Sequence, residues 1–330
     1  MYIKHENTQL SKEDESYAPK RLESFIGQDY IKDNLSVFTI AARQRNEPLD
    51  HVLLHGPPGL GKTTLAHIIA NEMEGTLKST SGPMLSKPAD LAGVLTNLKD
   101  KDVLFIDEIH RINISLEEVL YGAMENFSID ILVGEGNTAR PIKLPIPKFT
   151  LVGATTRIGL LSNPLRDRFG IHLRTEFYSA ISLQQIITKA CCAKEMKISD
   201  TAALEIAERS RGTPRIALRL LRRVADFALI EGTNYPITID IATKALEKLK
   251  VDKKGLDIND YKYLTLISEN YNGGPVGIDT IASSLSEQKD TIEEMIEPYM
   301  LQIGFVQKTP RGRVLSHLAL EYLCNNRHKK

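Results

Sequence analysis

The sequence predicts a three-layer α/β domain built on a parallel sheet, followed by a small helical domain and a C-terminal winged helix. Short apolar runs that alternate with helical or loop segments indicate the parallel sheet; they lie at 52–55, 103–106, 149–153 and 171–177. From residue 179 to residue 250 the strand pattern stops and helical spacing takes over. Beyond residue 260, three helical stretches precede two short strand-like runs, which is the element order of a winged helix.

Length, charge and cysteine usage restrict the class of protein. A chain of 330 residues exceeds one typical domain, and we expect domains at about 1–177, 178–250 and 251–330, with a flexible start to about residue 16. The 42 basic and 42 acidic residues balance, so any nucleic-acid binding has to be local. Residues 1–20 are too polar for a signal peptide or a membrane span, and no apolar run of about eighteen residues occurs elsewhere.

The cysteines indicate a reducing compartment. Cys191, Cys192 and Cys324 form no C-x-x-C pair, which argues against a zinc site and against a disulfide framework. A cytoplasmic protein fits this usage. We expect Cys191 and Cys192 to be buried in helix packing.

The first helix is expected at 30–45, and the strand at 52–55 leads into a glycine loop. The loop reads Gly56-Pro57-Pro58-Gly59-Leu60-Gly61-Lys62-Thr63, and apolar helical spacing follows it over 65–73. Glycines lack the Cβ atom that would keep backbone N–H groups from converging on phosphate oxygens at a helix N-terminus. Lys62 then reaches the β- and γ-phosphates, and the Thr63 hydroxyl ligates Mg²⁺. The strand, loop and helix together favour an ATP site over a mere glycine turn.

The strand at 103–106 ends in paired carboxylates, Asp107 and Glu108. Asp107 is placed to hold the Mg²⁺ shell, and Glu108 to orient or deprotonate the attacking water. An Asp-Glu pair after a strand is, on its own, more often an exposed turn. Together with the glycine loop, the pair predicts ATP hydrolysis.

A hairpin interrupts the alternation of strands and helices between about 129 and 144. Two strand-like segments flank a Gly134-Glu135-Gly136-Asn137 turn. Their apolar residues exceed what an isolated two-stranded ribbon should show to water. Two interpretations stay open on this composition, namely packing onto the body of the domain and docking of a partner.

The second domain is expected to contain four helices, at 182–196, 201–209, 214–231 and 240–250. Thr213-Pro214 is a good helix start, because a hydroxyl cap precedes a proline in the first turn. Arg215 follows in that turn, where its guanidinium can be aimed at a phosphate. Arg219, Arg222 and Arg223, on or near the same face, are interpreted as a solvated surface.

The charged segment 251–260 is interpreted as a linker to the winged helix. Helices are expected at 261–271, 280–285 and 290–301, and the wing at 305–309 and 313–315. The third helix carries Glu293, Glu294 and Glu297 and almost no positive charge, so we expect it to repel phosphate. The wing offers the cations that suit a DNA backbone better, with a wing used only for protein contact as the alternative; these cations are Lys308, Arg311 and Arg313.

Further motifs lie outside the glycine loop and the carboxylate pair. They are Leu151-Val152-Gly153-Ala154-Thr155-Thr156-Arg157, Asn163-Pro164-Leu165-Arg166-Asp167-Arg168-Phe169-Gly170, Arg211-Gly212-Thr213-Pro214-Arg215, Gly273-Gly274-Pro275-Val276-Gly277 and Thr309-Pro310-Arg311-Gly312-Arg313. As a set, in order and spacing, they resemble the RuvB family, the AAA+ motors of bacterial Holliday-junction branch migration. The resemblance runs from about Tyr17 to Leu323. It implies an α/β AAA+ P-loop ATPase fold with a helical lid and a winged-helix DNA-binding domain.

The resemblance also implies a role for each matching residue. Thr156 matches the first sensor, which reports the γ-phosphate; Arg168 matches the arginine finger, supplied in trans to a neighbour's ATP; Arg215 matches the second sensor, which couples the lid to the nucleotide. A finger is worth roughly 10³–10⁵ in rate, so hydrolysis requires a ring or at least a pair of subunits. The resemblance places further residues at the nucleotide: Tyr17, Ala18, Ile26, Gly59, Gly61, Lys62, Thr63, Thr64, Glu125, Asn126, Phe127 and Tyr178.

Cofactors and partners are implied in the same way. They are ATP, Mg²⁺, duplex DNA at Holliday junctions, a hexameric homo-oligomeric ring, RuvA docked on the hairpin at 129–144, and the junction resolvase RuvC. Arg311 is implied as a DNA-backbone contact, with Arg313 as its helper. Ala18 departs from the arginine usual in the family, and Gly122 and Asn126 replace a proline and an aspartate. None of these belongs to the hydrolytic set, so the departures concern nucleotide affinity rather than activity.

Two other functions share parts of this pattern. A clamp-loader subunit has the glycine loop, the carboxylates and the trans finger, but lacks a C-terminal winged helix with a Thr-Pro-Arg-Gly-Arg wing. An ATP-gated DNA-binding switch of the replication-initiator kind should read base edges, for which the acidic third helix is poorly suited. The motor is therefore the leading hypothesis.

Overall fold

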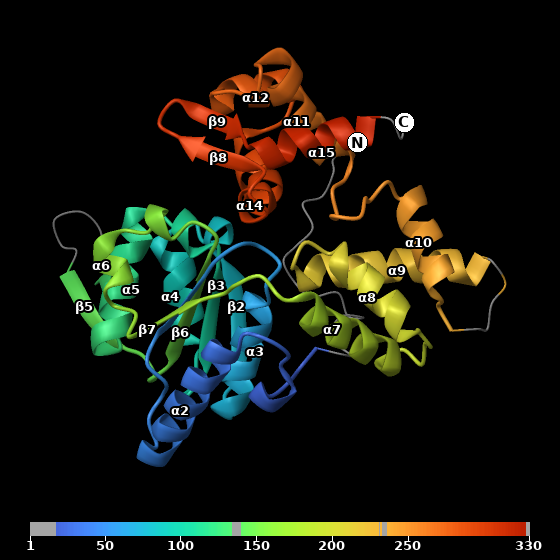
Figure 1. Cartoon of the computed structure of the whole chain (residues 1–330). Helices are drawn as coiled ribbons and strands as arrows, with labels where there is room; N and C mark the ends of the chain where they lie inside the picture. The colour runs from blue at the N-terminus through green and yellow to red at the C-terminus, as the bar shows by residue number, and fades with distance from the viewer. Residues whose placement is uncertain (1–17, 134–139, 231, 233–235, 328–330) are drawn as a thin grey trace. The chain divides into compact units, whose positions relative to one another are not determined.

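The computed structural model describes residues 18–133, 140–230, 232 and 236–327 (Figure 1). The chain forms two compact units. The first comprises the described residues up to Gly56 together with Leu60–Glu176, and the second comprises Pro57–Gly59 and the described residues from Phe177 onward. In the described part, no helix is both long and apolar enough to cross a membrane.

A parallel five-stranded sheet forms the centre of the first unit, in the order β2-β3-β6-β1-β7. The strands are β1 (Val52–His55), β2 (Leu77–Ser81), β3 (Val103–Asp107), β6 (Thr150–Thr155) and β7 (Ile171–Arg174). The predicted parallel sheet is confirmed. The strand β2 was missed because its sequence, Leu-Lys-Ser-Thr-Ser, contains no apolar run; it lies at an edge of the sheet and pairs only with β3.

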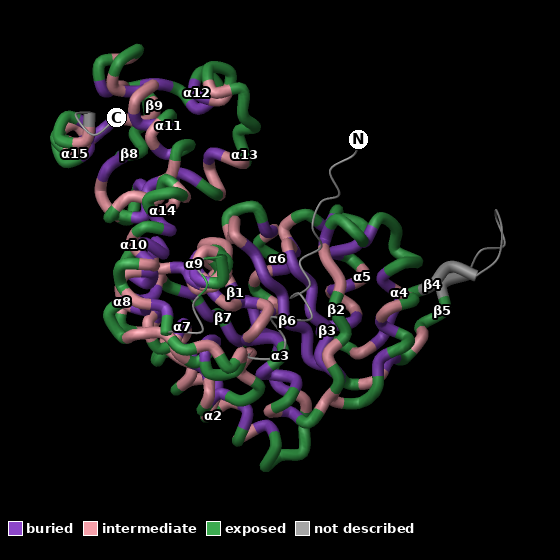
Figure 2. The backbone as a smooth tube through the Cα atoms, turned by 90° about the vertical axis from the view of Figure 1, so that its right-hand side faces the viewer, coloured by how far each residue is buried: buried purple, intermediate pink, exposed green. Residues whose placement is uncertain are grey.

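Helices cover both faces of the sheet, which gives the predicted three layers (Figure 1). They are α2 (Asp29–Arg45), α3 (Lys62–Glu72), α4 (Pro88–Thr96), α5 (Ile114–Asn126) and the short α6 (Asn163–Arg166). Alternate residues of each strand point to opposite faces, so Leu54 packs with α2 and α3 while Leu53 packs with α4 and α5. Strands buried on both faces read as continuous apolar runs, and Figure 2 shows β1, β3 and β6 as buried segments.

The predicted hairpin is present as antiparallel β4 (Ser128–Val133) and β5 (Arg140–Pro145). Ile129 and Ile146 are buried and Leu144 is partly buried in the core beneath α5, while Ile142 is 51% exposed. The base of the hairpin therefore packs on the body of the domain, and an apolar side chain farther along β5 faces outward. The turn at 134–137 lies outside the described residues.

The second unit begins with the four predicted helices, α7 (Ala180–Ala193), α8 (Asp200–Glu208), α9 (Pro214–Ile230) and α10 (Ile239–Lys248). Serine hydroxyls cap two of them: Ser179 accepts from the Ser182 N–H, and Ser199 from the Ala202 N–H. The expectation that both neighbouring cysteines are buried is wrong for one of them. Cys191 is buried, whereas Cys192, the next residue of α7, is exposed.

A winged helix follows in the same unit. Its elements are α11 (Ile258–Asn270), α12 (Ile278–Leu285), α13 (Lys289–Thr291), a π-helical turn η6 (Ile292–Ile296), α14 (Glu297–Gln302), β8 (Val306–Thr309), β9 (Gly312–Leu315) and α15 (His317–Arg327). Together α13, η6 and α14 form the predicted third helix. The wing strands pair antiparallel with Lys308 opposite Arg313. The closing helix α15 was not predicted.

The segment 251–260 connects the fourth lid helix, α10, to α11 of the winged helix, and it is a fixed connection. The Asp252 carboxylate accepts hydrogen bonds from the hydroxyls of Tyr261 and Tyr322, each at 2.7 Å. It also accepts from the backbone N–H groups of Lys254 and Leu256 at 2.8 Å, and Leu256 is fully buried. The polar residues of this segment serve as hydrogen-bond partners of the structure around them, which composition alone does not reveal.

Candidate nucleotide-hydrolysis site

The glycine loop starts where β1 ends, beside the end of β7. The Gly56 N–H donates to the Thr155 carbonyl at 3.2 Å. Gly56 has a φ of 140°, and a Cβ there would lie 2.5 Å from Thr175 Oγ1, so only glycine fits this approach. Gly61, with a φ of 93°, then caps α3. The loop is thereby held at the carboxyl edge of the sheet, as the sequence predicts.

Lys62 is the first residue of α3 and is largely buried, with 8% of it exposed. Its Nζ donates to the Gly56 carbonyl at 2.8 Å, so the ammonium lies within the loop. Thr63 and Thr64 follow in the first turn and are half-buried. Backbone N–H groups at the start of a helix, next to a buried ammonium, suit phosphate oxygens.

The predicted carboxylates and the first sensor come together at the same edge. Asp107 is buried at the end of β3, and its Oδ1 accepts the Glu108 N–H at 3.0 Å. Glu108 has a φ of 49°, which turns the chain away from the strand direction. The Thr156 hydroxyl donates to Glu108 Oε2 at 3.4 Å. A carboxylate that can act on water and a hydroxyl that can sense a phosphate therefore share one hydrogen bond.

His110 is a member of this cluster that sequence reasoning missed. Its Nδ1 lies 2.9 Å from Thr155 Oγ1 and 3.3 Å from Glu108 Oε2. The only available signal was its place two residues after Glu108. Through its contact with Glu108 the ring can orient that carboxylate, so we assign His110 a positioning role.

The predicted metal ligands suit a Mg²⁺ ion that binds together with the phosphates of a nucleotide. In the residues that the structure describes, no cluster of three or more His, Cys, Asp or Glu side chains could hold a metal ion alone. The predicted ligands are one hydroxyl, from Thr63, and one buried carboxylate, from Asp107. Mg²⁺ keeps several waters and commonly takes one or two protein ligands plus substrate phosphates.

The second unit brings Arg215 and Tyr178 together with Gly59. The Arg215 N–H donates to the Gly59 carbonyl at 3.4 Å, and a Cβ on Gly59 would lie 2.8 Å from Thr213 Cγ2. The Tyr178 N–H donates to the Gly212 carbonyl at 2.8 Å, and Tyr178 is buried. The backbone of Arg215, the predicted second sensor, therefore contacts Gly59, the middle glycine of the loop.

The predicted N-terminal contacts are only partly described. Tyr17 lies outside the described residues, while Ala18 and Ile26 are half-buried. Just after them, the Gln28 amide donates to the Glu176 carbonyl at 2.6 Å and accepts the Glu176 N–H at 3.1 Å. This two-bond clamp, which the sequence did not reveal, fixes the N-terminal segment beside the end of β7.

Arg168 lies at the other edge of the sheet, where the strands begin. It is three residues before β7, whose first residue pairs with the first residue of β1. Its Nη2 lies 2.9 Å from Glu125 Oε1, its Nη1 donates to the Pro164 carbonyl at 2.7 Å, and its guanidinium carbon lies 4.3 Å from the centre of the Tyr121 ring. The structure thus groups Arg168 with Glu125 and separates both from the glycine loop.

Asn126 and Phe127 belong to this same edge. Asn126 is exposed at the end of α5, and the Phe127 ring lies 6.1 Å from that of Phe149, which precedes β6. It also lies 6.5 Å from the ring of His51, which precedes β1. These two residues do not meet the glycine loop of their own chain.

The wing presents its three predicted DNA-binding cations differently. Arg311 is exposed at the turn. Arg313 donates to Glu297 at 2.7 Å and to Glu293 at 3.0 Å, and Lys308 Nζ lies 2.6 Å from Glu297. Burial raises the pKa of Glu297, but the hydrogen bonds from Arg313 and Lys308 outweigh it and hold that pKa below its usual value. Glu293 and Glu297 of the third helix are thus paired with wing cations, which offsets part of the negative charge expected to repel phosphate.

Comparison with known proteins agrees with this arrangement. Family models match three consecutive parts of the chain: the Holliday junction DNA helicase RuvB P-loop domain at 17–175, the RuvB AAA lid domain at 178–252 and the RuvB C-terminal winged helix domain at 253–324. The chain is 60% identical over 305 residues to the Holliday junction branch migration complex subunit RuvB of Orientia tsutsugamushi strain Boryong, covering 92% of this chain and 94% of that relative. It is 59% identical over 305 residues to the subunit of the same name from Rickettsia africae, covering 92% of this chain and 89% of the relative.

Solved structures agree over the same length. The structure of the Thermotoga maritima RuvB Holliday junction branch migration motor matches with a TM-score of 0.85 and 50% sequence identity, covering 94% of this chain and 98% of that one. The glycine loop with its buried lysine and the paired carboxylates make a nucleotide-binding and ATP-hydrolysing site. The chain belongs to the RuvB family of AAA+ P-loop ATPases, with that family's lid and winged-helix domains.

Proposed function

We propose that the chain is an ATP-driven DNA motor that migrates Holliday junctions during homologous recombination and DNA repair, as a ring on duplex DNA together with RuvA. The observation that carries the junction assignment is the identity of about 60% with relatives named as branch migration subunits, over 92% of the chain. The proposal that the motor is driven by ATP hydrolysis rests on the hydrogen bond between Thr156 and Glu108 at the carboxyl edge of the parallel sheet.

The nucleotide is held mainly by the loop and the start of α3. Lys62 exchanges its bond to the Gly56 carbonyl for the β- and γ-phosphates, and backbone N–H groups from Gly59 to Thr64 meet the phosphate oxygens. Tyr178, Ala18 and Ile26, with Tyr17, border the adenine. Mg²⁺, bound by Thr63 and Asp107, would neutralise charge on the phosphate oxygens.

Hydrolysis needs a correctly held water. Glu108 orients that water and draws its proton, while Thr156 contacts the γ-phosphate. Their shared hydrogen bond of 3.4 Å is long, so Thr156 can leave the carboxylate for a phosphate at little cost. Arg215, next to Gly59, reports the same nucleotide to the lid.

A neighbouring subunit completes the site. Arg168, with Glu125, Asn126 and Phe127 beside it, lies at the strand-start edge, away from its own glycine loop. We propose that these residues meet the nucleotide of the next subunit, so that activity requires a closed ring, expected to be hexameric.

The wing is the proposed contact with DNA. Arg311 is exposed at its turn and meets backbone phosphates, while Arg313 and Lys308 are held by Glu297 and support the wing. Contact with phosphates alone carries no sequence information, which suits a protein that moves along DNA.

The remaining partners follow from the same proposal. RuvA docks on the hairpin at 129–144, where Ile142 is exposed, and the resolvase RuvC acts on the same junctions. The protein works in the cytoplasm, where its DNA substrate lies.

Dissociation of a synthetic four-way DNA junction, with ATP and Mg²⁺ and with or without RuvA, tests the proposal. Wild type is expected to dissociate the junction faster with RuvA, and Lys62→Ala to lose both dissociation and ATPase activity. Lys78→Ala, at an exposed lysine of the edge strand β2, is the matched control. Sustained ATPase without any junction movement would instead support the clamp-loader or initiator-switch function.

A further inference from the structure

A buried arginine connects the second-sensor loop to the winged helix. Arg211 Nε donates to the Gly255 carbonyl at 2.7 Å. Its Nη2 lies 3.0 Å from Asp257 Oδ2 and also pairs with Asp260, whose carboxylate accepts from both terminal nitrogens. Only 9% of the Arg211 side chain is exposed. Guanidinium groups held by two carboxylates and a carbonyl have little freedom to move independently of them.

The other end of this loop lies at the nucleotide loop. Arg211 is followed by Gly212, whose carbonyl accepts the Tyr178 N–H, and Arg215 donates its N–H to the Gly59 carbonyl. Arg211 and Gly212 have φ values of 53° and 65°, so the chain makes a tight left-handed turn between the two sets of contacts. A shift of Arg215 is therefore carried to Arg211 over four residues without a flexible stretch between them.

The acceptors on the winged-helix side are equally fixed. Asp257 caps α11 by accepting from the Asn259 and Asp260 N–H groups, and Asp260 accepts the Asp257 N–H at 2.7 Å. Asp260 is almost fully buried, with 1% exposed. Gly255 has a φ of 77°, and a Cβ there would lie 2.5 Å from the Arg209 carbonyl. The acceptors thus form one rigid start of α11.

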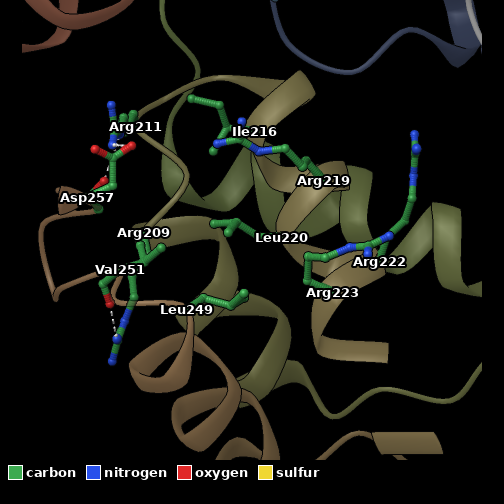
Figure 3. A pocket seen from close by; sticks show the side chains of 11 residues that line it. Arg209, Arg211, Ile216, Arg219, Leu220, Arg222, Arg223, Leu249, Val251 and Asp257 are labelled. Atoms are coloured by element: carbon green, nitrogen blue, oxygen red, sulfur yellow. Dashed lines mark hydrogen bonds and ion pairs between the residues drawn. The ribbon is translucent and has the colours of Figure 1, made fainter. Parts of the chain in front are cut away.

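A second contact joins the arginine to the helix before the wing. The Arg211 guanidinium carbon lies 5.6 Å from the centre of the Tyr299 ring, and Tyr299 on α14 donates its hydroxyl to the Lys254 carbonyl at 2.6 Å. Figure 3 shows Arg211 facing Asp257 at one wall of a pocket of about 450 Å³, with side chains of α9 at the other wall. The arginine therefore contacts α11 and α14, and α14 carries Glu297, which holds the wing.

We propose that Arg211 is the positioning residue that couples the nucleotide contacts of Arg215 and Gly59 to the orientation of the winged helix. It takes no part in ATP hydrolysis and does not touch DNA. Through the Arg211, Asp257 and Asp260 cluster, a change at the second sensor moves the start of α11 as one body. This inference rests on the proposed function, since it explains how hydrolysis and DNA contact act on each other.

Coupling between two sites is reciprocal, so it can be measured from either side. In wild type, DNA should stimulate ATPase activity, and nucleotide should change DNA affinity. Arg211→Met with Asp260→Leu removes the two most buried charges of the cluster together, because removing one of them would leave a buried charge alone; the more exposed Asp257 keeps its bonds to the start of α11. Arg223→Met with Asp226→Leu is the matched control, since it removes an exposed arginine–aspartate pair of α9.

The variant should keep basal ATPase activity and nucleotide-free DNA affinity within about 2-fold of wild type. We expect the DNA stimulation and the ratio of DNA affinities with ATPγS and with ADP to fall by at least 5-fold, since allosteric couplings are typically about 5- to 150-fold. The control should change neither. A wild-type stimulation retained in full by the variant overturns the role of Arg211 and leaves the motor intact. A wild type that DNA does not stimulate and whose DNA affinity ignores nucleotide refutes the motor itself.

If the double variant does not fold, Asp257→Asn tests the role of Arg211 instead. Asparagine caps helices as well as aspartate does, so α11 keeps its start while Arg211 loses one of its two carboxylates. Partial loss of stimulation, at unchanged basal activity, is expected. Full stimulation in Asp257→Asn, with the double variant unfolded, also counts against the proposal.

Discussion

Replacing Arg168 with alanine tests whether one subunit completes the hydrolytic site of the next. Within its own chain, Arg168 contributes an ion pair with the half-exposed Glu125 and a contact with the Tyr121 ring. Each is worth about 0.5–1 kcal/mol, so Arg168→Ala should fold normally. As a finger, the same side chain is worth roughly 10³–10⁵ in rate, and the variant should lose nearly all ATPase activity.

Mixing two inactive variants separates action in trans from action in cis. Lys62→Ala keeps Arg168, and Arg168→Ala keeps Lys62. In rings assembled at random from equal amounts, a site works when its own subunit retains Lys62 and its neighbour retains Arg168, which holds for about one quarter of the sites. If Arg168 served its own subunit, no site of the mixture would be complete.

The assay is steady-state ATPase activity at fixed total protein, measured for each variant alone and for mixtures across the full range of ratios. Activity should peak at the equal mixture at about one quarter of wild type. Arg166→Ala is the control, because Arg166 ends α6 two residues before Arg168 and its side chain bonds only to Asn163 among the contacts described. Full activity of Arg168→Ala alone, or a mixture no more active than its components although mixed rings form, would refute the reasoning.

Three further changes test other parts of the structure. Burial lowers the pKa of His51 below 6.5, so His51 binds a proton more readily in the unfolded chain than in the folded one. The first unit should therefore lose stability as pH falls below about 6.5. Urea unfolding of His51→Gln should show a weaker pH dependence. A Cβ on Gly153 would lie 2.9 Å from Phe169 Cζ, so thermal unfolding should find Gly153→Ala less stable by about 1–3 kcal/mol, and an unchanged midpoint would show that the neighbours yield freely. Glu297→Ala leaves the half-buried Arg313 without its main acceptor and should cost about 3–5 kcal/mol by denaturant titration, whereas a cost below about 1 kcal/mol would mean that the pair is replaceable.

Elements with strong local patterns could be predicted from the sequence. The strands β1, β3 and β6 each contain a continuous apolar run because both of their faces are covered, and such runs are easily recognised in a sequence. The glycine loop and the carboxylate pair are contiguous in the chain, so their chemistry can be read from neighbouring residues. The edge strand β2 carries no such run, because its side chains are half-buried or exposed.

The parts that could not be predicted depend on contacts between distant residues. The charge of Glu297 indicates a phosphate-repelling helix until its pairing with Arg313 is known. The polarity of 251–260 indicates a linker, but only the partners of Asp252 show that this linker is fixed. Likewise, nothing in the spacing of Gln28 indicates a clamp on Glu176. A polar residue's role is set by its partner, and one sequence does not give the partner.

The buried glutamate beneath the wing has a consequence for how firmly one subunit grips DNA. Of the three wing cations predicted to meet DNA, Arg313 and Lys308 are ion-paired with Glu297, whereas Arg311 is exposed at the turn and makes no ion pair among the described residues. One released counterion per wing corresponds to a salt slope of only about −0.9, so a single wing should detach within each cycle. In the proposed ring, several such weak contacts would together retain the DNA while any one of them dissociates. If the wing is the DNA contact proposed above, a loose individual grip set by Glu297 would let the proposed assembly advance instead of remaining bound in place.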